Sequence, residues 1–240
     1  MSEETVFDAW INPLVFLEVD EPWASLIQRE PDHKAVLRYL CSPETEDDLS
    51  NLVRRYKEIS RESGHLFAAP AEQRMIAKLV WPLKNAKGCY MVGNYLGTIA
   101  LCGVVAEMTA VLLFVISPIP ADSVPGKSKD SIERFERLGQ KQRVKILREH
   151  NLINEHQKGL FEIIRETRRG YLHYYSKNPS QSAADARRVF QAADAVVRTM
   201  IGQGIRDGKI ILNPALVRYL KRKGIARPPD EADEEGGKVG

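Results

Sequence analysis

Apolar residues recur at spacings of three and four along most of the chain, which is the period of an α-helix. The two-residue alternation of a β-strand does not persist long enough to indicate a sheet. The pattern therefore predicts an all-α protein. Helices are expected over residues 22–40 (one or two short ones, broken near Pro31), 42–61, 70–81, 86–116, 130–149, 154–178, 182–201 and 214–224.

Proline and glycine positions set the expected ends of these helices. Pro82 interrupts the helix that precedes it, and Gly139 divides the charged segment 130–149. Residues 117–129 contain three prolines and predict a loop. Asn178-Pro179 ends the helix before it, because the residue preceding a proline is displaced from the α region.

The lengths of these segments predict an up-and-down helical bundle with an additional N-terminal helical lobe. Three long helices and a shorter charged one fall within residues 86–205. We expect a lobe at residues 1–85, a bundle with its C-terminal helix at 86–225, and a disordered acidic tail at 226–240, where five carboxylates face two cations.

The most apolar stretch of the chain, residues 96–116, contains Glu107 as its one charged residue. Its length and composition fit either a buried core helix or a membrane span. Small residues recur in it at spacings of three and four, which allows another helix to pack closely. If the helix is buried in the bundle, Glu107 must meet a cation or a donor, because an unpaired buried carboxylate costs several kcal/mol.

Composition limits the classes of function only weakly. The formal net charge of +3 does not by itself imply a nucleic-acid partner. Cys41, Cys89 and Cys102 are odd in number and widely spaced, which predicts neither a zinc site nor a disulfide framework, and no cofactor is indicated. The acidic N-terminus has no basic region followed by an apolar run, so we expect a cytoplasmic protein without a secretory signal.

The main candidate for chemistry is Arg-Arg-Gly-Tyr-Leu-His at residues 168–173, late in the expected helix 154–178. On an ideal helix His173 shares a face with Arg169 and Glu166, whereas Arg168 lies about 140° away from it. Arg168 and His173 therefore act on one target only if the helix is kinked or widened near Gly170. Either Arg169 is the partner of His173 on a straight helix, or Arg168 is its partner across a distortion.

An arginine beside a histidine supplies what metal-free RNA cleavage needs. The guanidinium neutralises phosphoryl oxygens, and the imidazole takes or gives a proton near neutral pH. Tyr171 and its neighbours at 174 and 175 are candidates for stacking on bases or for orienting the imidazole. The alternative is structural: Arg and His form an intrahelical salt-bridge ladder with Glu162 and Glu166, and the tyrosines pack in the core.

The order of these elements resembles the HEPN superfamily (higher eukaryotes and prokaryotes nucleotide-binding domain). The resemblance rests on Arg168 followed by His173 near a helix end, and on the preceding helix with Glu107, and it covers about residues 86–205. It implies a homodimer with one composite cleft, with Arg168 and His173 catalytic and with Arg169, Glu107, Glu166 and Tyr171 in support. Nuclease members often carry Asn, Asp or another polar group after the motif arginine, where this chain has Arg169.

Three hypotheses of function follow. The first is a metal-independent endoribonuclease of a toxin–antitoxin or defence system, with an antitoxin or a nucleotidyltransferase as partner. The second is a non-catalytic helical dimerisation module that binds RNA, a nucleotide or a protein. The third is a membrane-associated protein that uses residues 96–116.

Overall fold

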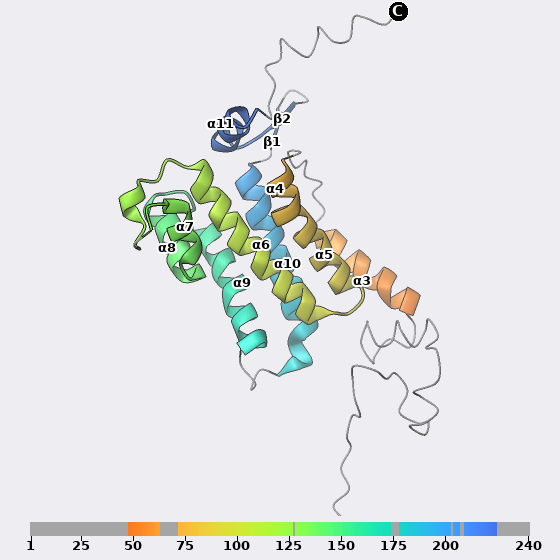
Figure 1. Cartoon of the computed structure of the whole chain (residues 1–240). Coiled ribbons are helices and arrows are strands. Elements are labelled where there is room, and N and C mark those ends of the chain that lie inside the picture. The colour runs from red at the N-terminus through yellow and green to blue at the C-terminus, as the bar shows by residue number, and fades with distance from the viewer. Residues whose placement is uncertain are drawn as a thin grey trace, which may run out of the picture.

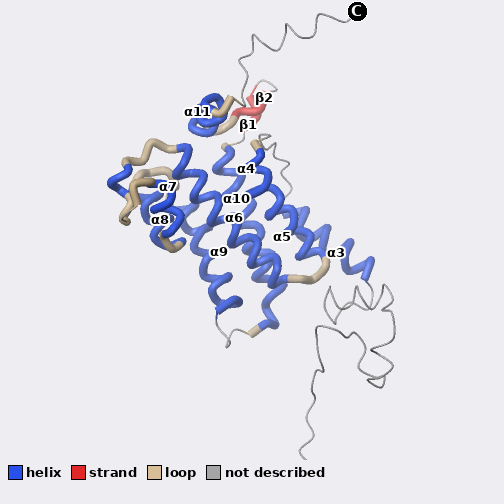
Figure 2. The backbone as a smooth tube through the Cα atoms, in the orientation of Figure 1, coloured by secondary structure: helices blue, strands red, loops and turns tan. Residues whose placement is uncertain are grey.

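The computed structural model describes residues 48–62, 72–126, 128–173, 178–202, 204–206 and 209–224. It confirms the all-α class, with one small β-hairpin beside the helices (Figure 2). The helices are α3 (Asp48–Glu62), α4 (Gln73–Met75), the π-helical segment η1 (Ile76–Val80), α5 (Trp81–Met91), α6 (Tyr95–Ile116), α7 (Ser131–Arg137), α8 (Gln140–Glu149), α9 (Glu155–His173), α10 (Ser182–Ile201) and α11 (Pro214–Arg222). Single 3₁₀ turns lie at Ala121–Ser123 and Pro179–Gln181. The expected helices at 22–40 and the acidic tail at 226–240 lie outside the described residues.

Four helices, α5, α6, α9 and α10, form a bundle in which successive helices run in opposite directions (Figure 1). Helices α6 and α10 lie at its centre, and each contacts the other three. The hairpin pairs β1 (Gly204–Arg206) antiparallel with β2 (Lys209–Ile211), between α10 and α11. The sequence did not predict this hairpin as a pair of strands, because each strand has only three residues.

Helix α6 supplies the centre of the core. Ile99, Cys102, Val105 and Ala110 in it have no measurable solvent exposure. By length and composition α6 is also long and apolar enough to cross a membrane, and 61% of its most apolar stretch is buried inside the structure. Over most of its surface this helix therefore contacts protein.

The prediction of one helix over 86–116 is wrong, because the chain turns between α5 and α6. Gly93 adopts a left-handed conformation with φ of 80°, which favours glycine. Asn94 then caps α6, and its Oδ1 accepts a hydrogen bond of 2.8 Å from the Gly97 backbone N–H. Gly93 therefore ends one helix and Asn94 begins the next. This break was not predicted, because the apolar pattern is continuous across it.

Pro82 does not interrupt its helix as predicted. It occupies the first turn of α5, directly after the π-helical segment, where the Trp81 N–H bonds to the Ile76 carbonyl. Proline has no backbone N–H to donate, and the wider π-helical turn before Pro82 lets the helix continue without that hydrogen bond. The expected boundary after residue 85 consequently falls inside α5. Met75 and Leu79 belong to the same buried core as α6, so residues 72–85 are part of the bundle and not of a separate lobe.

Helix α3 is attached to the end of α5 by polar contacts. The Arg55 guanidinium donates to the Met91 carbonyl at 3.3 Å and lies 5.8 Å from the centre of the Tyr95 ring. The Tyr90 hydroxyl donates to the Glu58 carboxylate at 3.1 Å. These contacts hold residues 48–62 against the turn between α5 and α6.

Helices α7 and α8 meet at Gly139, where the sequence predicted a break. Phe135 of α7 stacks on Phe114 of α6, with ring centres 4.2 Å apart. Arg143 of α8 donates from Nε to the Phe135 carbonyl at 3.1 Å. The corner between α7 and α8 is therefore fixed on α6, and the N-terminus of α8 lies beside α9.

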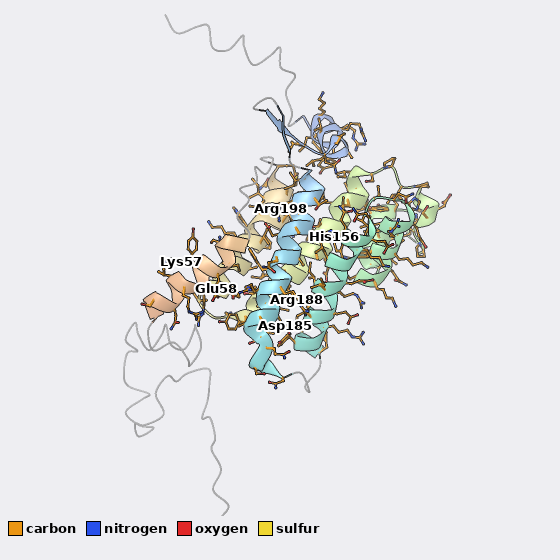
Figure 3. The ribbon with its side chains drawn as sticks, turned by 180° about the vertical axis from the view of Figure 1, so that it is seen from behind. Lys57, Glu58, His156, Asp185, Arg188 and Arg198 are labelled. Carbon is orange, nitrogen blue, oxygen red and sulfur yellow. The ribbon has the colours of Figure 1, made fainter. Side chains whose placement is uncertain are left out.

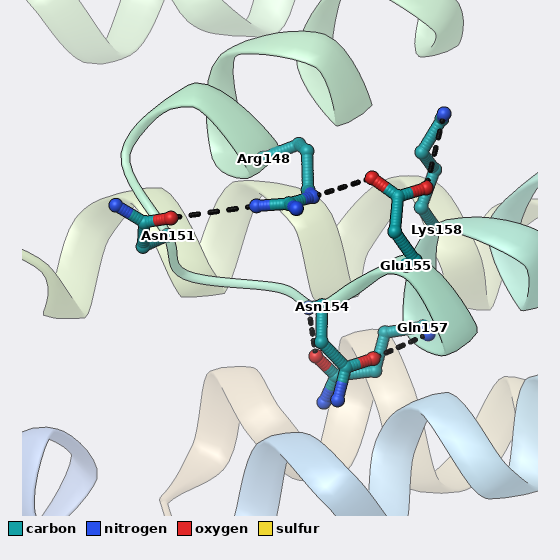
Figure 4. Close-up of polar contacts among 6 residues, drawn as sticks. All are labelled: Arg148, Asn151, Asn154, Glu155, Gln157 and Lys158. Carbon is teal, nitrogen blue, oxygen red and sulfur yellow. Dashed lines mark hydrogen bonds and ion pairs between the residues drawn. The ribbon is translucent and has the colours of Figure 1, made fainter.

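The start of α9 near Asn154 is confirmed. Asn154 and Gln157 exchange hydrogen bonds of 2.7 and 2.8 Å between side chain and backbone, a reciprocal helix cap (Figure 4). Helix α10 spans the predicted residues 182–201 and ends at Gly202, whose φ is 71°. The described part of α9 extends to His173, and residues 174–177, which precede the end predicted at Asn178, lie outside the described residues.

A candidate anion site in a cleft between helices α6, α8 and α9

A cleft of about 580 Å³ lies where α6, the N-terminus of α8 and the C-terminal half of α9 meet. Four of the residues singled out from the sequence line it: Glu107, Arg168, Arg169 and His173. Two cations that the sequence analysis missed, Lys141 of α8 and Arg165 of α9, line it as well. The structure thus brings four permanent cations and one imidazole to the same cavity.

Arg168 and His173 reach this cleft without a kink in the helix. The described helix is continuous from Glu155 to His173. At about 100° per residue, Arg165 and Arg169 lie between Arg168 and His173 on one side of α9. The cleft covers about half of the helix circumference, so Arg168 and His173 line opposite margins of it, and Gly170 is buried elsewhere on the helix. The distortion considered at Gly170 is absent: Arg169 is the arginine on the same face as His173, and Arg168 lines the cleft from the opposite margin.

Arg168 forms an ion pair with Glu107, which confirms that Glu107 meets a cation. The Nη1 of Arg168 donates to Oε1 of Glu107 across the interface of α6 and α9. The two side chains are 32% and 31% exposed, so solvent partly screens the pair. The ion pair fixes the direction of the Arg168 guanidinium. It also neutralises part of the positive charge of that side chain.

Gly103 provides the space that Arg168 occupies on α6. A Cβ atom at this position would meet Cδ of Arg168, with Nε at 2.9 Å and Cζ at 3.3 Å. A larger residue could not coexist with the observed position of Arg168, because such approaches are closer than van der Waals contact. Gly103 is one of the small residues that recur along 96–116, and its lack of a side chain leaves room for Arg168 at the edge of the cleft.

The N-terminus of α8 opens onto the same cleft. Its N-cap residue is Gly139, which contributes no side-chain cap, and the first turn contains no acidic residue. Gly139, Gln140 and Lys141 all line the cleft. The positive end of a helix dipole thus adds to the charge of the arginines, an arrangement that favours an anion. Both polar atoms of the Gln140 amide are enclosed without a hydrogen-bond partner among the described residues.

Two residues predicted to support the site do not line this cleft. Tyr171 lies on the side of α9 that contacts α10, and its hydroxyl donates to the Asp185 carboxylate at 2.9 Å. Asp185 also accepts from Arg188 at 3.0 Å, and Figure 3 shows these two side chains on α10. Glu166 is exposed and pairs with Arg165. The tyrosines at 174 and 175 lie outside the described residues.

Replacing Tyr171 by Phe should destabilise the fold without changing the cleft. Burial first, and then the hydrogen bond and charge of Asp185, raise the pKa of Tyr171 to about 12. The neutral phenol is the stabilised form, so this contribution is fully present below the usual tyrosine pKa of about 10 and is lost as the pH rises through 12. We expect the Phe variant to lose about 1 kcal/mol of unfolding free energy at pH 8.

The test compares ultraviolet absorbance titrations and thermal melts of the wild type and the Tyr171→Phe variant. The difference titration should show one tyrosine that ionises near pH 12. Weaker binding of inorganic phosphate by this variant would mean that Tyr171 contributes to the cleft after all.

The cleft has the chemistry of an anion site with a proton-transfer group. Within the described part of the chain, no group of three or more His, Cys, Asp or Glu side chains is placed to hold a metal ion. Comparison with protein-family models, with curated proteins and with solved structures gave no match for this chain. Function is therefore inferred from the chemistry of the cleft.

Proposed function

We propose that this protein is a metal-independent endoribonuclease of the HEPN type, with Arg168 and His173 as its catalytic residues. One observation carries the proposal: the exposed His173 lines the same cleft as four cations, Lys141, Arg165, Arg168 and Arg169. Cleavage of a phosphodiester requires both a group that stabilises negative charge on the phosphoryl oxygens and a group that moves protons.

The reaction uses the RNA itself as nucleophile. The ribose 2′-oxygen forms a bond to the adjacent phosphorus, and the bond from phosphorus to the 5′-oxygen of the next nucleotide breaks. A neutral imidazole accepts the 2′-hydroxyl proton, and an imidazolium gives a proton to the leaving 5′-oxygen. Arg168, directed by Glu107, hydrogen-bonds the non-bridging oxygens, on which charge accumulates. The products are a 2′,3′-cyclic phosphate and a 5′-hydroxyl end.

This scheme favours a homodimer. One imidazole cannot be both the base and the acid within a single concerted step, so a second proton-transfer group is needed. A second copy of the chain, placed with its own His173 at the same cleft, supplies it. The side chains of Leu172 and His173 are exposed at the end of α9, where such a partner would lie.

The proposal is tested with a single-stranded RNA that carries one 2′-deoxynucleotide, incubated with the protein in EDTA. Cleavage is expected at ribonucleotides and is expected to be absent on the 3′ side of the deoxynucleotide, because the nucleophile is missing there. The 5′ products should carry cyclic phosphate ends. Cleavage that requires Mg²⁺, or that proceeds at the deoxynucleotide, would contradict the proposal.

The ion pair between Arg168 and Glu107 supports a second candidate, a non-catalytic module that binds RNA or nucleotide in the same cleft. Glu107 already neutralises part of the Arg168 charge, so less of it is available for the charge that accumulates in the transition state. This candidate predicts salt-sensitive RNA binding without cleavage. The Arg168→Ala and Arg169→Ala variants should weaken that binding, and binding that is indifferent to salt would contradict it.

Substitutions at Gly139 can change the charge of the cleft and the unfolding free energy independently. A Cβ at Gly139 meets no atom within 4 Å, and its φ of −66° suits any residue. Both Gly139→Asp and Gly139→Asn should cap α8 and raise the unfolding free energy by a few tenths of a kcal/mol. Only the Asp variant adds a negative charge, so we expect its RNA affinity to fall by about fivefold. The measurements are fluorescence anisotropy with labelled RNA and chemical denaturation; equal affinities for the Asp and Asn variants would place the anion elsewhere.

A further inference from the structure

A second cleft, of about 570 Å³, lies along α8 and α9 next to the first. Lys141 and Arg165 line both clefts, so the two are contiguous. The second cleft also contains Lys145, Arg148 and Lys158, which the cleavage chemistry does not use. Among the described residues that line it, five cations face two carboxylates, Glu149 and Glu162.

From this continuity we propose that the groove is a track for the backbone of a single-stranded nucleic acid. The second cleft is then a set of phosphate subsites that adjoin the catalytic cleft. The inference rests on the proposed function for the identity of the first cleft. Beyond that function, the ligand is a polynucleotide strand several nucleotides long, and not a mononucleotide.

The antiparallel course of α8 and α9 arranges the cations in a line. Lys141, at the start of α8, shares the junction with Arg165, and Arg148, at the end of α8, lies at the corner with Lys158 (Figure 4). From Lys158 to His173 the helix axis rises about 22 Å, at about 1.5 Å per residue. A stacked strand rises about 3.4 Å per nucleotide along its axis, so the track is long enough for roughly six stacked nucleotides.

The existing partners of these cations are weak competitors for phosphate. Arg148 and Lys158 both contact the exposed Glu155, at 2.7 and 3.3 Å, and these contacts lower the pKa of its carboxyl, with the Arg148 hydrogen bond as the largest cause. Lys145 lies 3.6 Å from Glu149 on the surface of α8. Exposed pairs of this kind contribute little, because water screens both charges and competes for their hydrogen bonds.

The groove contacts the backbone of the strand more than its bases. Of the described side chains that line the two clefts, Phe161 is the one aromatic apart from the imidazole of His173, and it is 1% exposed. A strand therefore finds little surface on which to stack its bases, and its phosphates carry the interaction. The track should accept strands of different sequence with similar affinity.

The test measures the binding of non-cleavable 2′-O-methyl oligonucleotides, a dinucleotide and an octamer, to the full chain by fluorescence anisotropy. The double variant Lys145→Gln/Lys158→Gln removes two cations from the second cleft only. The control, Lys57→Gln/Lys84→Gln, removes the same charge from exposed positions on α3 and α5. Thermal melts of both variants verify that they are folded.

The second-cleft variant should bind the octamer about tenfold more weakly and the dinucleotide unchanged, with the control within about twofold of wild type. The slope of log affinity against log salt concentration should become shallower by about 1.4, at about 0.7 per phosphate of a single strand. The track is overturned if both lengths weaken equally, if the control weakens the octamer as much, or if polyglutamate of similar length competes as well as the octamer.

The results also separate this inference from the proposed function. If RNA is cleaved normally but the second-cleft variant binds the octamer like wild type, the track is wrong and the nuclease remains. If no cleavage occurs but octamer binding depends on Lys145 and Lys158, the nuclease is wrong and the strand-binding track remains.

Discussion

Replacing His173 by Ala is expected to lower the rate constant of RNA cleavage by about 10²–10⁴-fold, the usual effect of removing a positioned proton-transfer group. The side chain is exposed at the end of α9, so its loss should change the unfolding free energy by less than about 0.5 kcal/mol. RNA affinity should remain within a few fold of wild type, because the four cations of the cleft are unchanged. The measurement is single-turnover cleavage in EDTA, with anisotropy for binding.

His156 provides the matched control for this experiment. It is an exposed histidine on the same helix, near its opposite end, and it lines neither cleft (Figure 3). His156→Ala should cleave RNA at the wild-type rate. If His173→Ala retains wild-type cleavage, His173 is not catalytic, and the binding module becomes the better description of the cleft.

Replacing Gly103 by Ala is expected to give the second-largest loss, about 10²-fold in cleavage, the effect of displacing a catalytic group by about 1 Å. The new Cβ would overlap the Arg168 side chain and force the guanidinium away from Glu107. Overpacking at this interface of α6 and α9 should also cost about 1–3 kcal/mol of unfolding free energy. Rates and chemical denaturation are measured on the same preparations, below the temperature at which the variant begins to unfold.

Gly159→Ala is the control for the glycine itself. Gly159 lies in α9, and a methyl group at its Cα would meet no atom within 4 Å. Alanine there should raise the unfolding free energy by up to about 1 kcal/mol and leave cleavage unchanged. Normal cleavage by a folded Gly103→Ala variant would show that the position of Arg168 beside Glu107 does not matter for activity.

Local signals in the sequence were sufficient for several helix boundaries. Gly139 separates α7 from α8 because glycine weakens a helix at an otherwise charged, solvated segment. Asn154 begins α9 and Gly202 ends α10 through capping interactions within a few residues of each position. Local reasoning failed at Pro82, where a π-helical segment that the pattern does not reveal keeps the helix continuous.

The residues of the cleft could be predicted only in part. Arg168 and His173 could be chosen from the sequence because they lie on one helix, and Glu107 because it is the one charged residue of the apolar stretch 96–116. Lys141 could not be connected to them, since it belongs to another helix whose orientation depends on Phe135 stacking on Phe114. The position of Tyr171 within the motif did not show that its side chain contacts Asp185 of α10 instead of the cleft.

The all-α class and most of the helix ends follow from interactions within a few residues, and the Arg–His motif is read directly from the chain. The side chains that share a cavity are known only from the tertiary structure, because they come from α6, α8 and α9 and meet through the packing of these helices. The tertiary structure pairs Arg168 with Glu107, places the Arg168 side chain against Gly103, and joins two basic clefts through Lys141 and Arg165. Distances between helices far apart in the chain are set by side-chain packing, which no local pattern encodes.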